Sequence, residues 1–215
     1  MIKHLTLKER PSNSPWGRIT RPFLKALLLA AMTTAFVDAA RAQDYSKEFG
    51  FSAGYSPGST HGIGTIHGQQ FVQAGLDFGF VLYRWQNVYL KYKVSLIPVA
   101  FVHGDQATLR SRRKRTVYAG GADPISLQFN FNRHRRFEPF LTLTGGFLYF
   151  TEQVPVIDSS RYNFTFSGGG GGEYMIGRNS IIIGYRYHHI SNKDTGKKNP
   201  GIDSHILFMG FSFKR

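Results

Sequence analysis

The sequence predicts an all-β protein, an eight-stranded antiparallel transmembrane barrel of the outer-membrane type. Apolar and polar residues alternate along eight segments, and the connections between these segments are short and long in turn. The composition agrees, with 19 Phe, 11 Tyr and 24 Gly but only 19% charged residues. Aromatic residues and glycines suit strands and tight turns better than a helical bundle. The lack of cysteine excludes disulfides and thiolate metal sites.

Residues 1–42 have the parts of a secretory signal peptide. A basic region ends at Lys25, an apolar run follows over 26–37, and Ala40-Arg41-Ala42 supplies an A-x-A cleavage pattern before Gln43. A membrane anchor is the alternative, but the run is shorter than the roughly 20 residues that a spanning helix needs. We therefore expect export and a mature barrel over residues 43–215.

Eight segments beyond residue 43 carry the two-residue period of half-buried strands. The most regular cover 72–82, 88–96 and 125–132, and similar runs cover 48–56, 138–150, 162–175, 180–191 and 202–213. The polar face includes Lys91, Lys93 and Asn130. Such residues suit the interior of a membrane barrel, whose apolar face points outward to lipid, better than the interior of a soluble barrel.

The connections set the orientation of the barrel. Short turns are expected at 83–87, 133–137 and 176–179, and longer connections at 57–69, 103–123, 151–161 and 192–201. Short periplasmic turns and long outer loops are typical of outer-membrane barrels. Both ends of the barrel chain are then periplasmic, and 192–201 lies on the outer side.

The charge of +14 is compatible with several polyanionic partners. Residues 1–42 hold seven of the 27 basic and two of the 13 acidic residues, so the remainder keeps 20 against 11. A basic run over 110–115 falls in the second long connection. On an exported barrel we expect it to meet lipopolysaccharide phosphates or solvent rather than nucleic acid. His61 and His67 lack nearby carboxylates, and adjacent histidines such as His188-His189 are not a ligand spacing, so we expect no metal and no cofactor.

The densest group of reactive side chains flanks the last outer connection. Strand parity puts His189 and Ser191 in the outward row of 180–191, and Asp203 in the outward row of the neighbouring strand. Polar groups on a lipid face are costly and call for a reason. His189 can take the proton of Ser191 while Asp203 orients the imidazole, and the Asn192 amide can donate to an oxyanion. The alternative is a set of rim residues that meet lipid head groups.

The stretch GYRYHHISNKDTGKKNPGIDS at 184–204 resembles the C-terminal signature of the PagL-type lipid A deacylases, also called acyloxyacyl hydrolases. The matching positions are His189, Ser191, Asn192, Asn199, Gly201 and Asp203. The glycine-rich segment 168–172 is also similar to the family. The acid is Asp here and Glu in the founding type, and a glycine of the family's oxyanion hole aligns with Asp194.

The resemblance implies a metal-free serine esterase of the outer membrane that removes the 3-position ester-linked acyl chain of lipid A. Ser191 would be the nucleophile, His189 the base and Asp203 the orienting acid. Asn192, Asn199 and Gly201 would form or support the oxyanion site. The substrate would be lipopolysaccharide in a surrounding membrane. A non-catalytic structural or adhesive barrel is the alternative function, and the oligomeric state is open, a homodimer included.

Overall fold

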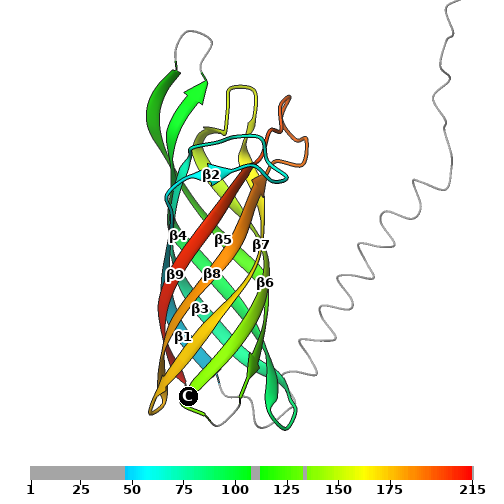
Figure 1. Cartoon of the computed structure of the whole chain (residues 1–215). Coiled ribbons are helices and arrows are strands. Elements are labelled where there is room, and N and C mark those ends of the chain that lie inside the picture. Colours follow the sequence, from blue (N-terminus) through cyan, green and yellow to red (C-terminus); the bar gives the residue numbers. More distant parts are fainter. Residues whose placement is uncertain (1–46, 108–111, 133–134, 215) are drawn as a thin grey trace, which may run out of the picture. The chain divides into compact units, whose positions relative to one another are not determined.

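Eight long antiparallel strands close into a barrel in the computed structural model, which describes residues 47–107, 112–132 and 135–214 (Figure 1). The strands are β1 (Lys47–Ser56), β3 (Gln70–Arg84), β4 (Val88–Ala107), β5 (Arg112–Phe131), β6 (Phe137–Val154), β7 (Ser160–Ile176), β8 (Asn179–Ser191) and β9 (Ile202–Lys214). Each long strand pairs with the next, and β1 pairs with β9. The predicted fold class is confirmed. The predicted signal peptide lies outside the described residues and stays a prediction.

The second long connection differs from the prediction. We expected a loop over 103–123, but β4 and β5 continue to pair up to Ala107 and Arg112. Register shifts between Lys93 and Ser95, and between Ile97 and Ala100, interrupt the two-residue period. The sequence pattern therefore ends before the strands do. Within the basic run, the side chain of Arg115 is exposed and pairs with Glu152 at 2.7 Å.

The outer surface of the barrel is apolar, as the sequence predicts. Large apolar side chains that are more than a third exposed occur on all eight long strands, and include Phe51, Phe78, Leu96, Ile125, Leu141, Phe166, Ile183 and Leu207. This surface matches the lipid-facing band of an outer-membrane barrel. Among the described residues, no helix is long and apolar enough to cross a bilayer.

The interior near the short turns holds a network of buried charges. Lys91 Nζ lies 2.6 Å from Glu48 Oε1 and 2.9 Å from Glu173 Oε2. Lys214 Nζ lies 3.0 Å from Glu173 Oε1, which also accepts a hydrogen bond from Ser180. The network joins β1, β4, β7, β8 and β9 across the barrel, so it fixes strands that are not neighbours.

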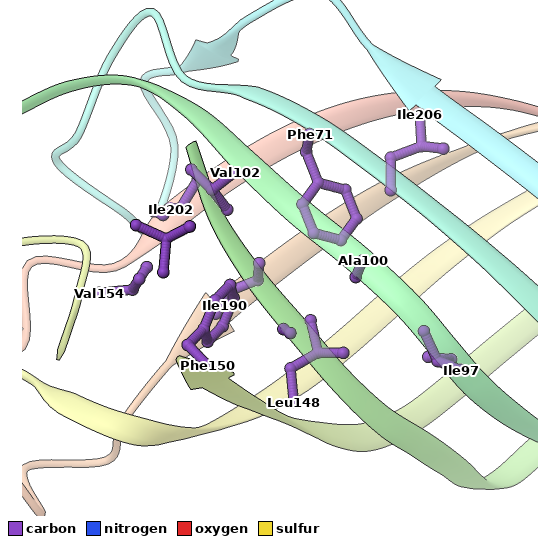
Figure 2. Packing of buried hydrophobic residues seen from close by; sticks show 12 residues of the cluster. Phe71, Ile97, Ala100, Val102, Leu148, Phe150, Val154, Ile190, Ile202 and Ile206 are labelled. Atoms are coloured by element: carbon purple, nitrogen blue, oxygen red, sulfur yellow. The ribbon is translucent and has the colours of Figure 1, made fainter. Parts of the chain in front are cut away.

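The interior near the long connections is apolar, although the sequence predicts a polar interior. The cluster comprises Phe71, Ile97, Ala100, Val102, Val117, Ala119, Leu148, Phe150, Val154, Ile190, Ile202 and Ile206 (Figure 2). The register shift after Ile97 lies beside this cluster and contributes to hiding its pattern. The barrel therefore has an apolar core at one end and a charged core at the other.

The charge network gives a test of stability. We expect Lys91→Met to lower the free energy of unfolding by about 3 kcal/mol, because it leaves buried carboxylates without their closest partner. Glu152→Gln should cost less than about 1 kcal/mol, because its pair with Arg115 is exposed. Urea unfolding of the folded barrel in detergent measures both. Equal losses in the two variants would contradict a structural role for the network.

Candidate active site

His189 and Asp203 face each other on neighbouring strands. The register of β8 and β9 makes the two residues direct partners. His189 Nδ1 lies 2.5 Å from Asp203 Oδ1. The Asp203 side chain is fully buried and that of His189 is 14% exposed. An aspartate is one methylene shorter than a glutamate, but Asp203 still reaches the imidazole.

The residues between these groups point the opposite way and are held in the apolar core. Ile190 follows His189, and Ile202 precedes Asp203. Both isoleucines are buried in the cluster of Figure 2. Because successive side chains in a strand point to opposite faces, burying the isoleucines inside turns His189 and Asp203 outward. Packing of the core therefore gives His189 and Asp203 the outward direction that the sequence pattern predicts.

Ser191 is the next outward residue of β8 after His189. Two strand residues separate Cα atoms by about 7 Å, a span that an imidazole leaning along the strand can bridge. Within the described part of the chain, no hydrogen bond joins the Ser191 hydroxyl to His189. Ser191 is half-buried and lies opposite Phe164 of β7. The Lys193 ammonium lies 5.1 Å from the Phe164 ring, which brings a cation close to the serine.

The connection after Ser191 is shaped by two asparagines. The Asn192 N–H donates to Asn199 Oδ1 at 3.0 Å, and the Asn192 side-chain amide donates to the Lys198 carbonyl at 2.8 Å. Asn192 Oδ1 accepts from the Asp194 N–H at 2.9 Å. Asp194 has φ 61°, the left-handed conformation that glycine adopts most easily. Asn192 and Asn199 thus brace the turn beside the serine.

Gly201 lies directly against the imidazole. Its φ is +66°, and a Cβ there would lie 3.0 Å from His189 Cε1 and 3.1 Å from Gly64 Cα. Position 201 requires glycine for two reasons, the left-handed backbone conformation and the close packing.

A third element covers the site. The connection 57–69 contains β2 (Ser59–Thr60), which pairs with Ser204 and Asp203 at the start of β9. The Gly64 N–H donates to Asp203 Oδ2 at 2.7 Å. The Tyr187 hydroxyl lies beside the same carboxylate, since a Cβ built on Gly62 would lie within 3 Å of the hydroxyl oxygen and of Asp203 Oδ2. Sequence reasoning missed Gly64 and gave Tyr187 no role, because a backbone donor 139 residues away has no side-chain signal.

The histidines of this connection were not expected to bind a metal. The His61 and His67 rings stack with centroids 3.5 Å apart. Within the described residues, no group of three or more His, Asp or Glu side chains is arranged to hold a metal ion.

The lipid A 3-O-deacylase (PagL) family matches residues 72–212. The chain belongs to the PagL family. The sequence has no significant match among curated proteins. Among solved structures, the outer membrane enzyme PagL is 18% identical, covers 75% of this chain and 97% of its own, and has a TM-score of 0.57. Neisserial surface protein A is 16% identical over 80% of this chain and 96% of its own, with a TM-score of 0.43. The PagL structure shares the barrel fold, and the family match covers β8 and most of β9, where the candidate site lies.

Gly201 offers a test of the packing around the imidazole. We expect Gly201→Ala to slow the labelling of Ser191 by a fluorophosphonate at least tenfold, because the methyl group would displace His189 or Gly64. Gly177→Ala is the control, since Gly177 has φ +62° with nothing within 4 Å of an added Cβ. Each variant should lose about 1–2 kcal/mol of stability from its left-handed backbone. Equal labelling rates would show that the contact with His189 has no chemical consequence.

Proposed function

We propose that this PagL-family barrel is an outer-membrane serine esterase that hydrolyses the 3-position acyl ester of lipid A. The observation that carries the proposal is the contact between His189 and Asp203, with Ser191 next on the same lipid-facing row. The alternative, rim residues that only contact lipid head groups, would not need a carboxylate fully buried against an imidazole. The family match supplies the substrate class.

The tautomer of His189 follows from its partner. Asp203 Oδ1 accepts from Nδ1–H, so Nε2 carries the lone pair that can take a proton from Ser191. The Ser191 oxygen then forms a bond to the ester carbonyl carbon. When the tetrahedral intermediate collapses, the bond to the glucosamine oxygen breaks and His189 returns the proton to that oxygen. Water attacks the acyl-serine in the same way, which releases the fatty acid and restores Ser191.

Asn199 is the proposed side-chain donor to the oxyanion. Its Oδ1 accepts from the Asn192 N–H, so its amide nitrogen points in a different direction and keeps its protons for another acceptor. The Asn192 amide already donates to Lys198 and accepts from Asp194. We therefore assign Asn192 and Gly201 to support of the site, and Asn199 to the developing negative charge.

The outward position of the site suits a lipid substrate. Phe164 and Phe166 lie opposite Ser191 and His189 on β7, and Tyr162 continues the row. These rings offer an apolar surface to an acyl chain that already lies beside the barrel wall. The exposed Lys193 stands next to the serine and can pair with a glucosamine phosphate. A substrate in the outer leaflet then reaches Ser191 without leaving the membrane.

Mass spectrometry of lipid A incubated with the folded barrel tests the proposal. We expect loss of one 3-hydroxyacyl chain with the intact protein and none with Ser191→Ala. Asp203→Asn should reduce kcat by about ten-thousand-fold, because the imidazole loses the group that fixes its tautomer. Ser204→Ala is the matched control, since Ser204 is buried on the inward face of β9. No mass change with the intact protein, across several lipid A types, would favour a non-catalytic barrel.

Asn199 can be tested without losing the turn. Asn199→Asp keeps an oxygen that accepts from the Asn192 N–H but removes the amide donor. We expect kcat to fall by about a hundredfold or more, which is typical for loss of one oxyanion donor. The melting temperature should stay close to that of the intact protein, while Asn199→Ala should lower both. Unchanged kcat in Asn199→Asp would remove Asn199 from the oxyanion site.

A further inference from the structure

The connection 57–69 is built onto the candidate site through its backbone. Its strand β2 pairs with the start of β9, and Thr65 N–H donates to the Pro200 carbonyl at 2.7 Å. The Ile66 N–H donates to the Gly201 carbonyl at 3.4 Å. In Figure 1 this segment lies at the same end of the barrel as the 192–201 connection. The segment is therefore bonded to the backbone of residues 200–204, the stretch that contains Asp203.

Two glycines give this segment its close approach to the carboxylate. Gly64 donates its N–H to Asp203 Oδ2, and a Cβ on Gly64 would lie 2.7 Å from the Gly201 carbonyl carbon. A Cβ on Gly62 would overlap Asp203 Oδ2 and would lie 2.9 Å from the Tyr187 hydroxyl oxygen. Neither position has room for a side chain. At Gly62 that space is occupied by the Asp203 carboxylate and the Tyr187 hydroxyl, and at Gly64 by the backbone of Gly201 and Ile202.

We propose that Gly64 and Tyr187 are positioning residues for the acid of the triad, and that the part of this connection from Ser59 to Ile66 belongs to the catalytic apparatus. The inference rests on the proposed function, because it assigns a role within that site. Gly64 donates to Oδ2 and the Tyr187 hydroxyl lies close by, which leaves Oδ1 directed at His189. Gly62 has no side chain, so it leaves room for Asp203 Oδ2 and the Tyr187 hydroxyl.

The Asp203 carboxylate needs hydrogen bonds to its second oxygen because the group can rotate. A carboxylate can rotate about its last bond, and most rotations turn both oxygens away from His189 Nδ1. Charge-assisted hydrogen bonds to the second oxygen remove that freedom. They also satisfy the charge of a carboxylate that is fully buried on the outward face of the barrel, where an unsatisfied acceptor would be costly.

The segment has an internal brace that does not touch the carboxylate. Ser59 Oγ donates to the Ile66 carbonyl at 2.8 Å and accepts from the Gln69 N–H at 3.0 Å. These bonds tie both ends of the 59–69 turn together. A change at Ser59 would reach Asp203 only through the position of the segment, which makes Ser59→Ala a second route to the same effect.

The experiment compares kcat and KM for lipid A deacylation in matched pairs. Gly62→Ala should lower kcat by about 10- to 100-fold with little change in KM, as expected for a misplaced catalytic group. Gly58→Ala, whose added Cβ meets only Gly68 Cα at 3.9 Å, should stay within about twofold of the intact protein. Tyr187→Phe should lower kcat about tenfold. Tyr185→Phe is its control, because the Tyr185 hydroxyl bonds to His205 on the same face.

A double-mutant cycle with Asp203→Asn separates positioning from general damage. If Gly62 acts through the carboxylate, Gly62→Ala should have little further effect on Ser191 labelling by a fluorophosphonate once Asp203 is replaced. Equal loss in both backgrounds, or unchanged kcat in Gly62→Ala, Ser59→Ala and Tyr187→Phe, would overturn the inference while leaving the proposed function intact. An intact protein that neither hydrolyses lipid A nor labels at Ser191 would overturn the proposed function itself.

Discussion

The candidate site depends on the strict alternation of side chains along β8 and β9. His189 and Ser191 can stand outside the barrel only because Ile190 between them is buried inside. Ile202 and Ile206 do the same for Asp203 and His205 on the next strand. The apolar cluster of Figure 2, inside the barrel, therefore determines which side chains of β8 and β9 face outward. A shift of one residue in either strand would move the reactive groups into the interior and the isoleucines into the lipid.

The two ends of the interior place different demands on the chain. Near the short turns, Lys91, Glu48 and Glu173 link distant strands through charge pairs that specify one arrangement of the barrel. Near the long connections, close packing of branched and aromatic side chains leaves the wall little freedom to move. A site that must hold a 2.5 Å contact across two strands benefits from the second kind of core, because packed side chains resist displacement in every direction.

How far the sequence predicts this molecule depends on the distance over which each signal acts. Alternation is local, so it predicts the strands and the outward row of His189 and Ser191. The strand extension of β4 was missed because register shifts near Pro98 break the period. The role of Gly64 was missed for a different reason: its contribution is a backbone N–H, which every residue except proline possesses. Only the folded chain shows that this N–H meets Asp203.

A carboxylate on the outer face of the barrel raises a problem that the first outer connection solves. Lipid offers no hydrogen bonds, so an exposed carboxylate there would tend to take up a proton or turn toward water. The cover formed by 57–69 supplies the Gly64 donor and excludes both lipid and solvent, which leaves Asp203 fully buried. The same cover leaves His189 partly exposed. A buried carboxylate on the outer face of a barrel thus needs a piece of protein outside the barrel wall, and here the glycines of 57–69 allow that piece to approach Asp203 closely.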